Sequence, residues 1–292
     1  MESITLSAPA KVNLMLKVLG RRADGYHDIL TLFERISLSD TVTITKTRGG
    51  IDIVSDRPIT ARPEDNIAYK AAAAALGYAG SDKGVKIEIK KRIPIAAGLG
   101  GGSSDAAAVL SGINRLFSLN MDNRALRRLG AGLGADVPFF LLGRPFALGR
   151  GIGERLRVVM PRFKLWHLII YPGFKVATKG VYEAFDSLKP KCLTMKNTGV
   201  RINSLKHWGD MEPLLCNDLE EIAAGRIPVI GKIIKCLASS LGKKAIVSGS
   251  GPSVFCLYRT GKEARKAKDR LFRCVPEAAR RRWQVFVVGT EV

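Results

Sequence analysis

The stretch from Pro94 to Ser104, with the sequence PIAAGLGGGSS, places closely spaced glycines and two adjacent serines in one segment. It follows an alternating run, Val85 to Lys90, that is typical of a strand, and precedes Asp105 to Leu110, which is rich in helix formers. A helix start leaves its first amide hydrogens unpaired and carries partial positive charge, and glycines let an anion approach the backbone. The pattern therefore predicts a phosphate cradle, and the ligand we expect is the phosphate chain of a nucleotide.

Two well-known glycine-rich phosphate-binding motifs do not match this stretch. A P-loop needs Lys followed by Ser or Thr after its last glycine, whereas Gly102 is followed by two serines. A dinucleotide fingerprint that begins at Gly98 and Gly100 would need a glycine where Ser103 stands. A flexible hinge is the remaining alternative, and the two hydroxyls beside a helix start argue against it. The predicted nucleotide-binding residues are Pro94, Ile95, Ala96, Ala97, Gly98, Leu99, Gly100, Gly101, Gly102, Ser103 and Ser104.

Length and composition bound the class of protein. With 292 residues, of which 46% are hydrophobic, the chain can bury a large core in one large or two medium domains. It has no run of about eighteen apolar residues and no signal-peptide pattern at its start, so we expect a cytoplasmic protein without a membrane partner. The five cysteines form no Cys-x-x-Cys pair, which argues against zinc and a disulfide framework and favours reduced thiols.

The net charge of +21, from 47 basic and 26 acidic residues, favours anionic partners. Much of this charge lies in clusters: Lys262 to Arg270, Arg280 to Arg282, and the group Arg124, Arg127 and Arg128. The clusters lack the interleaved aromatic residues of a nucleic-acid platform. We therefore interpret them as solvated helix faces, compatible with steering of polyphosphate substrates, and expect no nucleic-acid partner.

Local patterns place the elements that must position the cradle. Alternating or β-branched runs predict strands at Ser3 to Ala8, Val12 to Val18, Ile29 to Ser37, Thr41 to Thr47 and Ile51 to Ser55. Helices are expected at Asn66 to Leu76, Ser104 to Phe117 and Asn123 to Leu129, and a glycine-rich loop at Gly130 to Pro138. Pro161 interrupts the pattern near Met160, which predicts one domain over residues 1–160 and a second over 161–292.

The second domain is predicted as α plus β. Helices are expected at Lys179 to Leu188, Asp218 to Ala223, Pro228 to Leu241 and Gly261 to Phe272. Strands are expected at Leu165 to Tyr171, Ala245 to Ser248, Ser253 to Tyr258 and Gln284 to Val288. The polar stretch Lys189 to Asn203 is predicted as a mobile surface loop.

Two further segments combine small residues with chemically capable ones: Ala8 to Asn13 (APAKVN) and Ser248 to Ser253 (SGSGPS). Taken in order with the glycine loop, these three islands resemble the three motifs of the GHMP kinase superfamily, a group that includes galactose, homoserine and mevalonate kinases. The resemblance spans almost the whole chain. Arg22 to His27 (RADGYH) and Gly134 to Phe140 (GADVPFF) narrow it to the branch that phosphorylates a cytidine-diphosphate-linked methylerythritol.

The resemblance implies a fold and an activity. The fold would be the two-domain α+β architecture of GHMP kinases, with a ribosomal-protein-S5-domain-2-like N-terminal domain that binds ATP and a ferredoxin-like C-terminal domain on the substrate side. The activity would be transfer of the γ-phosphate of ATP to the 2-hydroxyl of diphosphocytidyl-methylerythritol. That reaction is a step of the non-mevalonate route to isoprenoid precursors.

Phosphoryl transfer needs positioning, charge neutralisation and a group that accepts the hydroxyl proton. By analogy with the family, Asp136 is the expected base and Lys11 its partner, which would neutralise charge on the transferring phosphate. Asn13 would share a strand face with Lys11, because side chains alternate with period two, and could bind substrate or orient the lysine. The alternatives are a helix-capping or loop-stabilising aspartate for Asp136 and a surface lysine for Lys11.

The resemblance also assigns the acceptor site. Tyr26 would stack on the cytosine ring while His27 reads its polar edge, and Thr178 and Tyr182 would line the substrate site. The chain departs from the branch at two positions: the branch often has Pro where this chain has Lys179, and Phe where it has Tyr182, whose ring can still stack. The segment Gly249 to Ser253 would place backbone amides near the acceptor or the phosphates.

Cofactor and partner expectations follow. Besides ATP we expect Mg²⁺, but no pair of carboxylates identifies an all-protein site, so the ligands stay open, with Ser104 one possible contact. The partner would be a small-molecule substrate, and the chain a monomer or weak homodimer. Two alternatives remain: another GHMP kinase of homoserine or mevalonate type, and a basic nucleic-acid-binding protein.

Overall fold

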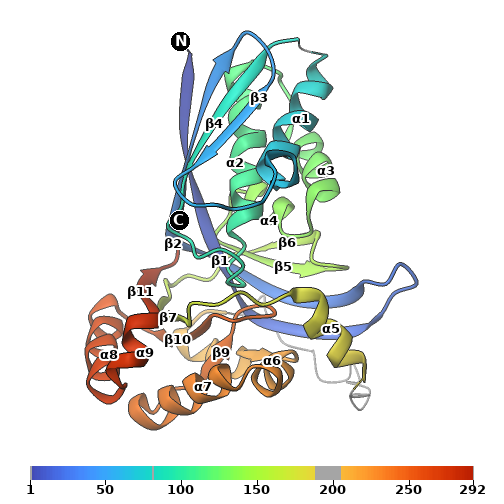
Figure 1. Ribbon diagram of the computed structural model, residues 1–292. Coiled ribbons are helices and arrows are strands. Elements are labelled where there is room, and N and C mark those ends of the chain that lie inside the picture. Colours follow the sequence, from blue (N-terminus) through green and yellow to red (C-terminus); the bar gives the residue numbers. More distant parts are fainter. Residues whose placement is uncertain (1, 81, 188–204, 292) are drawn as a thin grey trace. The chain divides into compact units, whose positions relative to one another are not determined.

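The computed structural model describes residues 2–80, 82–187 and 205–291, and the chain forms two compact units (Figure 1). The first unit comprises residues 1–10, 38–95 and 100–144, and the second comprises 11–37, 96–99 and 145–292. Two long strands, β1 (Ser3–Arg21) and β2 (His27–Thr47), contribute residues to both units. The predicted domain boundary after residue 160 stays a prediction.

The first unit is a sheet covered by helices on one face (Figure 1). Its strand order is β3 (Ile51–Ser55), β4 (Gly84–Lys90), β2 and β1, with β3 parallel to β4 and β4 antiparallel to β2. The helices are α1 (Ile67–Ala79), α2 (Gly101–Leu116), α3 (Asn123–Leu133) and α4 (Val137–Leu141), with a 3-10 turn at Pro63–Asp65. The sheet is therefore mixed and buries its apolar face under helices.

Helix α2 lies close to the sheet because of one glycine. A Cβ added at Gly112 would lie 2.4 Å from Cδ1 of Ile44 and 2.8 Å from Cδ1 of Leu6. The ends of these two side chains would have to move to admit a Cβ, so the absence of one lets α2 pack closely on the sheet. The close approach matters for function, because α2 carries the second half of the glycine loop on its first turn.

The second unit holds two groups of strands. Around β1 and β2, the strand β8 (Cys216–Asn217) pairs parallel with β1, β5 (Phe146–Arg150) pairs antiparallel with β2, and β6 (Arg155–Val159) with β5. The other group is a four-stranded antiparallel sheet in the order β11 (Gln284–Gly289), β7 (Trp166–Tyr171), β10 (Val254–Tyr258) and β9 (Ala245–Val247).

Five helices complete the second unit: α5 (Thr178–Ser187), α6 (Glu220–Arg226), α7 (Pro228–Leu241), α8 (Gly261–Cys274) and α9 (Glu277–Arg282). Two 3-10 turns, Trp208–Asp210 and Glu212–Leu214, precede α6. Helices α7 and α8 form one core with the four-stranded sheet, which includes Ile230, Ile233, Leu237 and Leu271. A second cluster packs α5 and α6 against β1 through Leu16, Val18, Val181, Phe185, Leu219 and Ile222.

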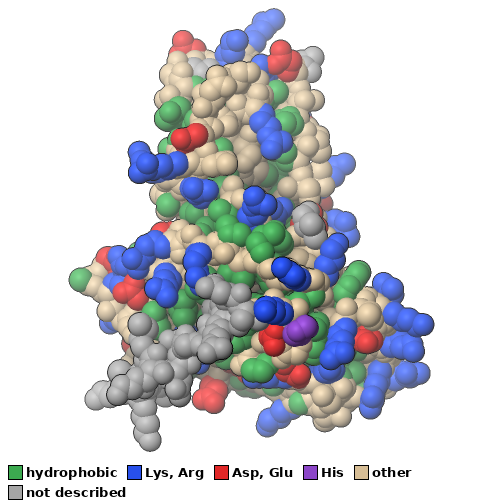
Figure 2. Space-filling model, turned by 180° about the vertical axis from the view of Figure 1, so that it is seen from behind, with side chains coloured by type: hydrophobic (Ala, Val, Ile, Leu, Met, Phe, Trp, Pro, Cys, Tyr) green, Lys and Arg blue, Asp and Glu red, His purple; other side chains and the backbone are tan. Residues whose placement is uncertain are grey.

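Helix α8 illustrates how the basic charge is placed. It buries Gly261, Ala264, Ala267 and Leu271 and leaves its Lys and Arg side chains at the surface, apart from the half-buried Lys268. In Figure 2 Lys and Arg side chains gather over α8 and α9. The interpretation of this cluster as a solvated helix face is confirmed. Among the described residues, no helix combines the length and hydropathy needed to cross a membrane.

Most sequence-predicted elements are present, with differences at their ends. The predicted strands at Ser3 to Ala8 and Val12 to Val18 are one strand, β1, because the φ of proline suits extended backbone and Pro9 removes only one donor. Helix α2 begins at Gly101, three residues before the expected start. The predicted loop Gly130 to Pro138 was wrong at both ends, since α3 runs to Leu133 and α4 begins at Val137.

Some elements were missed. Strands β5, β6 and β8 and helix α9 were not predicted, because their runs are short and lack periodicity. The predicted mobile loop, Lys189 to Asn203, and Leu188 at the expected end of α5 lie outside the described residues.

Candidate functional site

Strand β1 carries a buried polar chain in the second unit. The Nζ of Lys11 donates to Oδ1 of Asn13 at 2.6 Å, Nδ2 of Asn13 donates to Oγ1 of Thr31 at 2.8 Å, and that hydroxyl donates to the carbonyl of Met15 at 2.8 Å. Lys11 is 4% exposed and Asn13 is 2% exposed. The two lie on one strand face, as the period of two predicts. Lys11 is not a surface lysine, since its ammonium is held in place, 5.7 Å from the centroid of the Phe33 ring.

The third island lies directly against this pair. A Cβ added at Gly249 would be 3.3 Å from Oδ1 of Asn13 and 3.5 Å from Nζ of Lys11. Gly249 also has a φ of 58°, a value that L side chains rarely adopt. Glycine is therefore required at this position on two grounds, the close approach and the backbone conformation.

The glycine loop contributes its first half, residues 96–99, to the same place. The Lys11 amide donates to the carbonyl of Leu99 at 2.9 Å, and the Ser248 hydroxyl donates to the carbonyl of Gly98 at 2.9 Å. A Cβ at Gly98 would lie 2.3 Å from the carbonyl oxygen of Ser248. Parts of three islands far apart in the sequence thus meet within the second unit: Lys11 to Asn13, residues 96–99 and Ser248 to Ser253.

Sequence analysis misses Asn217, which orders the third island. Its Nδ2 donates to the carbonyls of Val247 and Gly249, both at 2.7 Å, and its Oδ1 accepts from the Leu219 amide at 2.9 Å. Substitution at Asn217 would leave buried carbonyls without these donors. The sequence signal is weak, because an Asn beside Asp218 is equally typical of an ordinary turn.

The second half of the glycine loop belongs to the first unit. Gly100 has a φ of 70° and caps α2, and no side chain caps this helix start. The amides of the first helical turn are therefore available to a ligand. The Ser104 side-chain oxygen is buried and has no hydrogen-bond partner among the described residues. These groups fit a phosphate chain with its Mg²⁺, because the amides donate to phosphate and a hydroxyl oxygen can ligate the ion.

Asp136 lies in the first unit, near this helix start. A Cβ at Gly134 would be 3.9 Å from Oγ of Ser103, so the loop before Asp136 lies close to the glycine loop. Asp136 is half-buried and immediately precedes α4, yet its side chain makes no capping hydrogen bond to that helix. The capping alternative is therefore excluded for Asp136.

A buried ion cluster lies beneath the helix start. The Nζ of Lys91 is 2.5 Å from Oδ2 of Asp40 and 2.7 Å from Oδ2 of Asp105, and all three side chains are at most 3% exposed. Burial raises the pKa of Asp105 to about 7, although the neighbouring Lys91 ammonium opposes that rise. For Lys91 the two carboxylates outweigh burial and raise its pKa. Sequence analysis misses this cluster because the run Lys90 to Arg92 is typical of a solvated strand end.

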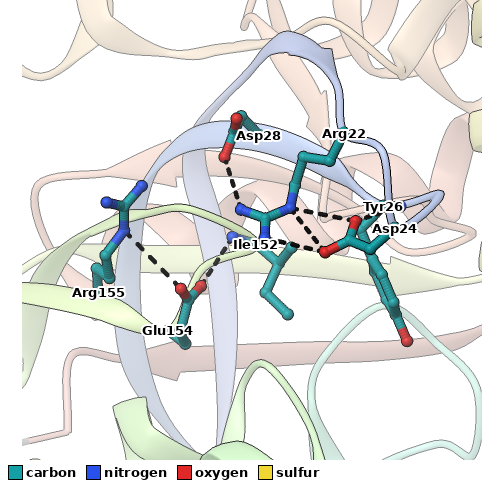
Figure 3. A network of polar contacts seen from close by, with 7 residues as sticks. All are labelled: Arg22, Asp24, Tyr26, Asp28, Ile152, Glu154 and Arg155. Carbon is teal, nitrogen blue, oxygen red and sulfur yellow. Dashed lines mark hydrogen bonds and ion pairs between the residues drawn. The ribbon is translucent and has the colours of Figure 1, made fainter.

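The turn between β1 and β2 presents Tyr26, whose side chain is exposed, with 61% of its surface accessible. Figure 3 shows the Arg22 guanidinium between the carboxylates of Asp24 and Asp28, with contacts of 2.9 and 3.2 Å. The Tyr26 amide donates to Oδ1 of Asp24 at 3.1 Å, and the hydrogen bond with Arg22 lowers the pKa of Asp24. An ionic network therefore fixes the backbone from which Tyr26 projects.

His27, in contrast, is buried against α5. Its Nε2 lies 2.7 Å from Oδ1 of Asp186, and its ring stacks on that of Tyr182 with centroids 4.9 Å apart and an interplanar angle of 27°. Thr178, at the start of α5, shares a hydrogen bond of 2.9 Å between its Oγ1 and Oγ of Ser250. Helix α5 thus brings two predicted substrate residues to two places, Tyr182 to His27 and Thr178 to the third island.

Comparisons with known proteins assign the family. The family models for the GHMP kinases N terminal domain and the GHMP kinases C terminal match residues 66–144 and 198–277. The 4-diphosphocytidyl-2-C-methyl-D-erythritol kinase of Geobacter metallireducens is 45% identical over 269 residues, which cover 91% of this chain and 93% of that protein. That of Moorella thermoacetica is 41% identical over 95% of this chain and 98% of the relative.

Solved structures agree with this assignment. A crystal structure of 4-(cytidine 5'-diphospho)-2C-methyl-D-erythritol kinase, 35% identical, superposes with a TM-score of 0.77 over 99% of this chain and 100% of that chain. A homoserine kinase from Cytophaga hutchinsonii, 20% identical, superposes with a TM-score of 0.73 over 100% of this chain and 95% of that chain, which supports the fold alone. The predicted two-domain α+β architecture of GHMP kinases is confirmed. The chain therefore belongs to the GHMP kinases and, among them, to the family of the 4-diphosphocytidyl-2-C-methyl-D-erythritol kinases.

Proposed function

We propose that this protein transfers the γ-phosphate of ATP to the 2-hydroxyl of 4-diphosphocytidyl-2-C-methyl-D-erythritol, giving ADP and the 2-phosphate. One observation carries the proposal: the three islands meet at Lys11, whose buried ammonium lies beside Asn13 and Gly249 and whose amide donates to the carbonyl of Leu99. The names of the relatives support the choice of acceptor. The reaction would belong to the non-mevalonate route to isoprenoid precursors, in the cytoplasm, carried out by a monomer or weak homodimer.

ATP would bind through its phosphates to the glycine loop, residues 94–104. The uncapped start of α2 offers the amides of its first turn as donors to the phosphate oxygens. Mg²⁺, which GHMP kinases generally use with ATP, would neutralise phosphate charge when bound. Within the described residues no group of three or more His, Cys, Asp or Glu side chains could hold a metal alone, so Ser104 and the phosphates would share its coordination.

Asp136 is the proposed base. As the acceptor oxygen bonds to the γ-phosphorus, the bond from phosphorus to the ADP oxygen breaks and the hydroxyl proton passes to the Asp136 carboxylate. The proposal is supported by its half-buried position and by the absence of a capping role. Lys11 would stabilise the charge on the phosphoryl group, and its hydrogen bond to Asn13 holds the ammonium ready before substrate binds.

Different residues would bind the cytosine ring and the polyol of the acceptor substrate. The exposed ring of Tyr26 offers a face for stacking on cytosine. The His27 imidazole, whose Nε2 lies 2.7 Å from Oδ1 of Asp186, would offer its Nδ1 to the edge of the base. Asn13 and Thr178 would contact the polyol side, since both lie against the third island. Tyr182 would act through the His27 ring on which it stacks.

ADP release tests this function directly. Purified protein is incubated with ATP, Mg²⁺ and one of three alcohols: diphosphocytidyl-methylerythritol, homoserine or mevalonate. We expect turnover with the cytidine compound alone. Turnover only with another alcohol would keep the kinase chemistry and reject the acceptor, and the absence of turnover with all three would reject the kinase assignment.

A further inference from the structure

The buried ion cluster of Lys91, Asp40 and Asp105 has no part in the proposed chemistry, yet it lies at both ends of the glycine loop. Lys91 comes three residues before the loop begins at Pro94, and Asp105 follows the loop directly. The Lys91 ammonium bridges the two, with 2.7 Å between Nζ and Oδ2 of Asp105. One ion pair inside the first unit therefore joins the two residues, Lys91 and Asp105, that flank the loop.

Asp40 on β2 also holds the entry segment, residues 91–93, which leads into the loop. Its Oδ2 pairs with Lys91 at 2.5 Å, while its Oδ1 accepts the amides of Arg92 at 2.6 Å and Ile93 at 2.8 Å. One carboxylate thus holds three successive residues of the incoming chain. Because Asp40 lies within a strand, this entry is anchored to the sheet.

The exit from the loop is anchored by the same ammonium. A Cβ added at Gly101, the first residue of α2, would be 3.4 Å from Nζ of Lys91 and 3.0 Å from Cγ2 of Ile93. The helix start therefore lies against the ammonium and the entry segment. A side chain here would require Ile93 and Lys91 to shift by a few tenths of an ångström, so the close approach favours glycine at a position whose φ is not positive.

We infer that Lys91, Asp40 and Asp105 form a positioning cluster that holds the two ends of the glycine loop together, so that its amides are ordered for nucleotide phosphates before nucleotide binds. The inference rests on the proposed nucleotide site for its consequence, but the tether itself is a property of the nucleotide-free protein. Ordering donors in advance lowers the entropy lost on binding.

The charges in the cluster determine which variants are informative. With both carboxylates ionised, the cluster carries one net negative charge next to a site for anions. Asp105→Asn should therefore be tolerated, because an amide oxygen still accepts from Lys91. Asp105→Ala removes the acceptor and releases α2 from the ammonium, but leaves the Lys91–Asp40 pair.

Hydrogen exchange in the nucleotide-free protein measures the tether. In Asp105→Ala we expect amides of residues 94–104 to exchange about tenfold faster than in the wild type, and in Asp105→Asn at the wild-type rate. Glu34→Ala is the matched control, since Glu34 is equally buried, lies 3.0 Å from His167 and accepts from Thr290, all within the second unit. It should destabilise the protein without faster exchange in the loop.

Binding of AMPPNP with Mg²⁺ and steady-state kinetics measure the consequence. Asp105→Ala should weaken AMPPNP binding about tenfold and raise KM for ATP by a similar factor, with KM for the acceptor within about twofold. Asp105→Asn should stay within about threefold of the wild type in both. If the alanine protein does not fold, Asp105→Leu, which fills similar space without an acceptor, replaces it.

The outcomes separate the inference from the proposed function. Wild-type exchange and AMPPNP binding in Asp105→Ala would overturn the inference, as would equal weakening of AMPPNP binding by Glu34→Ala. If the wild type does not bind AMPPNP, the proposed function fails, while the exchange rates in the nucleotide-free proteins still decide whether the cluster holds the loop.

Discussion

Two regions of the molecule use ion pairs in opposite surroundings. At the base of the glycine loop, Lys91 and two carboxylates are almost fully buried. At the Tyr26 turn, the side chains of Arg22, Asp24 and Asp28 are between 37% and 49% exposed. Water screens the second network, so its net contribution to stability is small, whereas removal of one buried partner leaves an uncompensated charge. We expect the glycine-loop region to govern stability and turnover, and the Tyr26 turn to govern affinity for the acceptor.

The largest effect is expected for Asp136→Asn, which tests whether the glycine-loop region governs turnover. An amide cannot accept the hydroxyl proton, so kcat should fall by a factor of about a hundred to ten thousand while AMPPNP binding stays near the wild type. Initial rates and analogue titration measure both quantities. Asp269→Asn, on the exposed face of α8, is the control. Retention of most activity in Asp136→Asn would remove Asp136 from the role of base.

Lys91→Met tests the stability side of the comparison. Two buried carboxylates lose their cation, which should lower the free energy of unfolding by about 3–5 kcal/mol in urea titrations. Lys86→Met on β4, the strand that directly precedes Lys91, is the matched control: Lys86 pairs with Glu88 at 3.1 Å, but its side chain is 42% exposed. Lys86→Met should lower the free energy of unfolding by less than about 1 kcal/mol. Equal losses in the two proteins would contradict the contrast between buried and exposed pairs.

The pH dependence of stability should differ in sign between the two regions. Asp105 has a folded-state pKa of about 7 against an ordinary 3.8, so between these values the folded state holds a proton that the unfolded state has lost. Its contribution is therefore present at low pH and is lost as pH rises from about 4 to 7. For Asp24 the pKa is lowered, so its contribution is present above the ordinary value and is lost as pH falls through the lowered one.

Urea titrations from pH 4 to pH 8, on the wild type and on Asp105→Asn, measure how the contribution of Asp105 to the free energy of unfolding changes with pH. Relative to Asp105→Asn, the wild type should lose stability as the pH rises towards 7. A difference between the two proteins that does not change with pH would show that Asp105 does not titrate in this range.

Tyr26→Ala tests whether the Tyr26 turn governs affinity for the acceptor. Loss of a stacked base costs about 1–3 kcal/mol, so KM for the cytidine substrate should rise about fivefold or more, with KM for ATP and the unfolding free energy unchanged. Tyr26→Phe keeps the ring and should behave like the wild type. A change confined to KM for ATP would place Tyr26 in the wrong pocket.

Arg22→Ala should have the smallest effect. Its pairs with Asp24 and Asp28 are exposed, so the melting temperature should not change measurably, and KM for the cytidine substrate should rise no more than about threefold. Arg62→Ala, which removes a similar exposed pair with Asp65, is the control for stability. If Arg22→Ala raised KM as much as Tyr26→Ala does, the turn would be ordered by its ion pairs despite their exposure.

Residues with local signatures were predictable. The glycine loop, the shared face of Lys11 and Asn13 and most elements follow from periodicity and from glycine chemistry, which act over a few residues. The resemblance to the GHMP kinases then connected three motifs that are far apart in the sequence and predicted that they form one site. Asn217, Lys91 and Asp186 were not predicted, because each takes its role from a partner remote in sequence, or from burial that no local pattern reports.

The family, the phosphate-binding chemistry of the loop and the residue types at the site could be inferred without the fold, since local conformation and motif order encode them. The fold was needed to show that Lys11 is buried and held by Asn13, that Gly249 lies against both, and that the Lys91 ammonium pairs with Asp105 across the loop. The reason is physical: whether a lysine is solvated or buried depends on which distant carbonyls and carboxylates the fold brings within hydrogen-bond reach, and burial then makes that pairing obligatory.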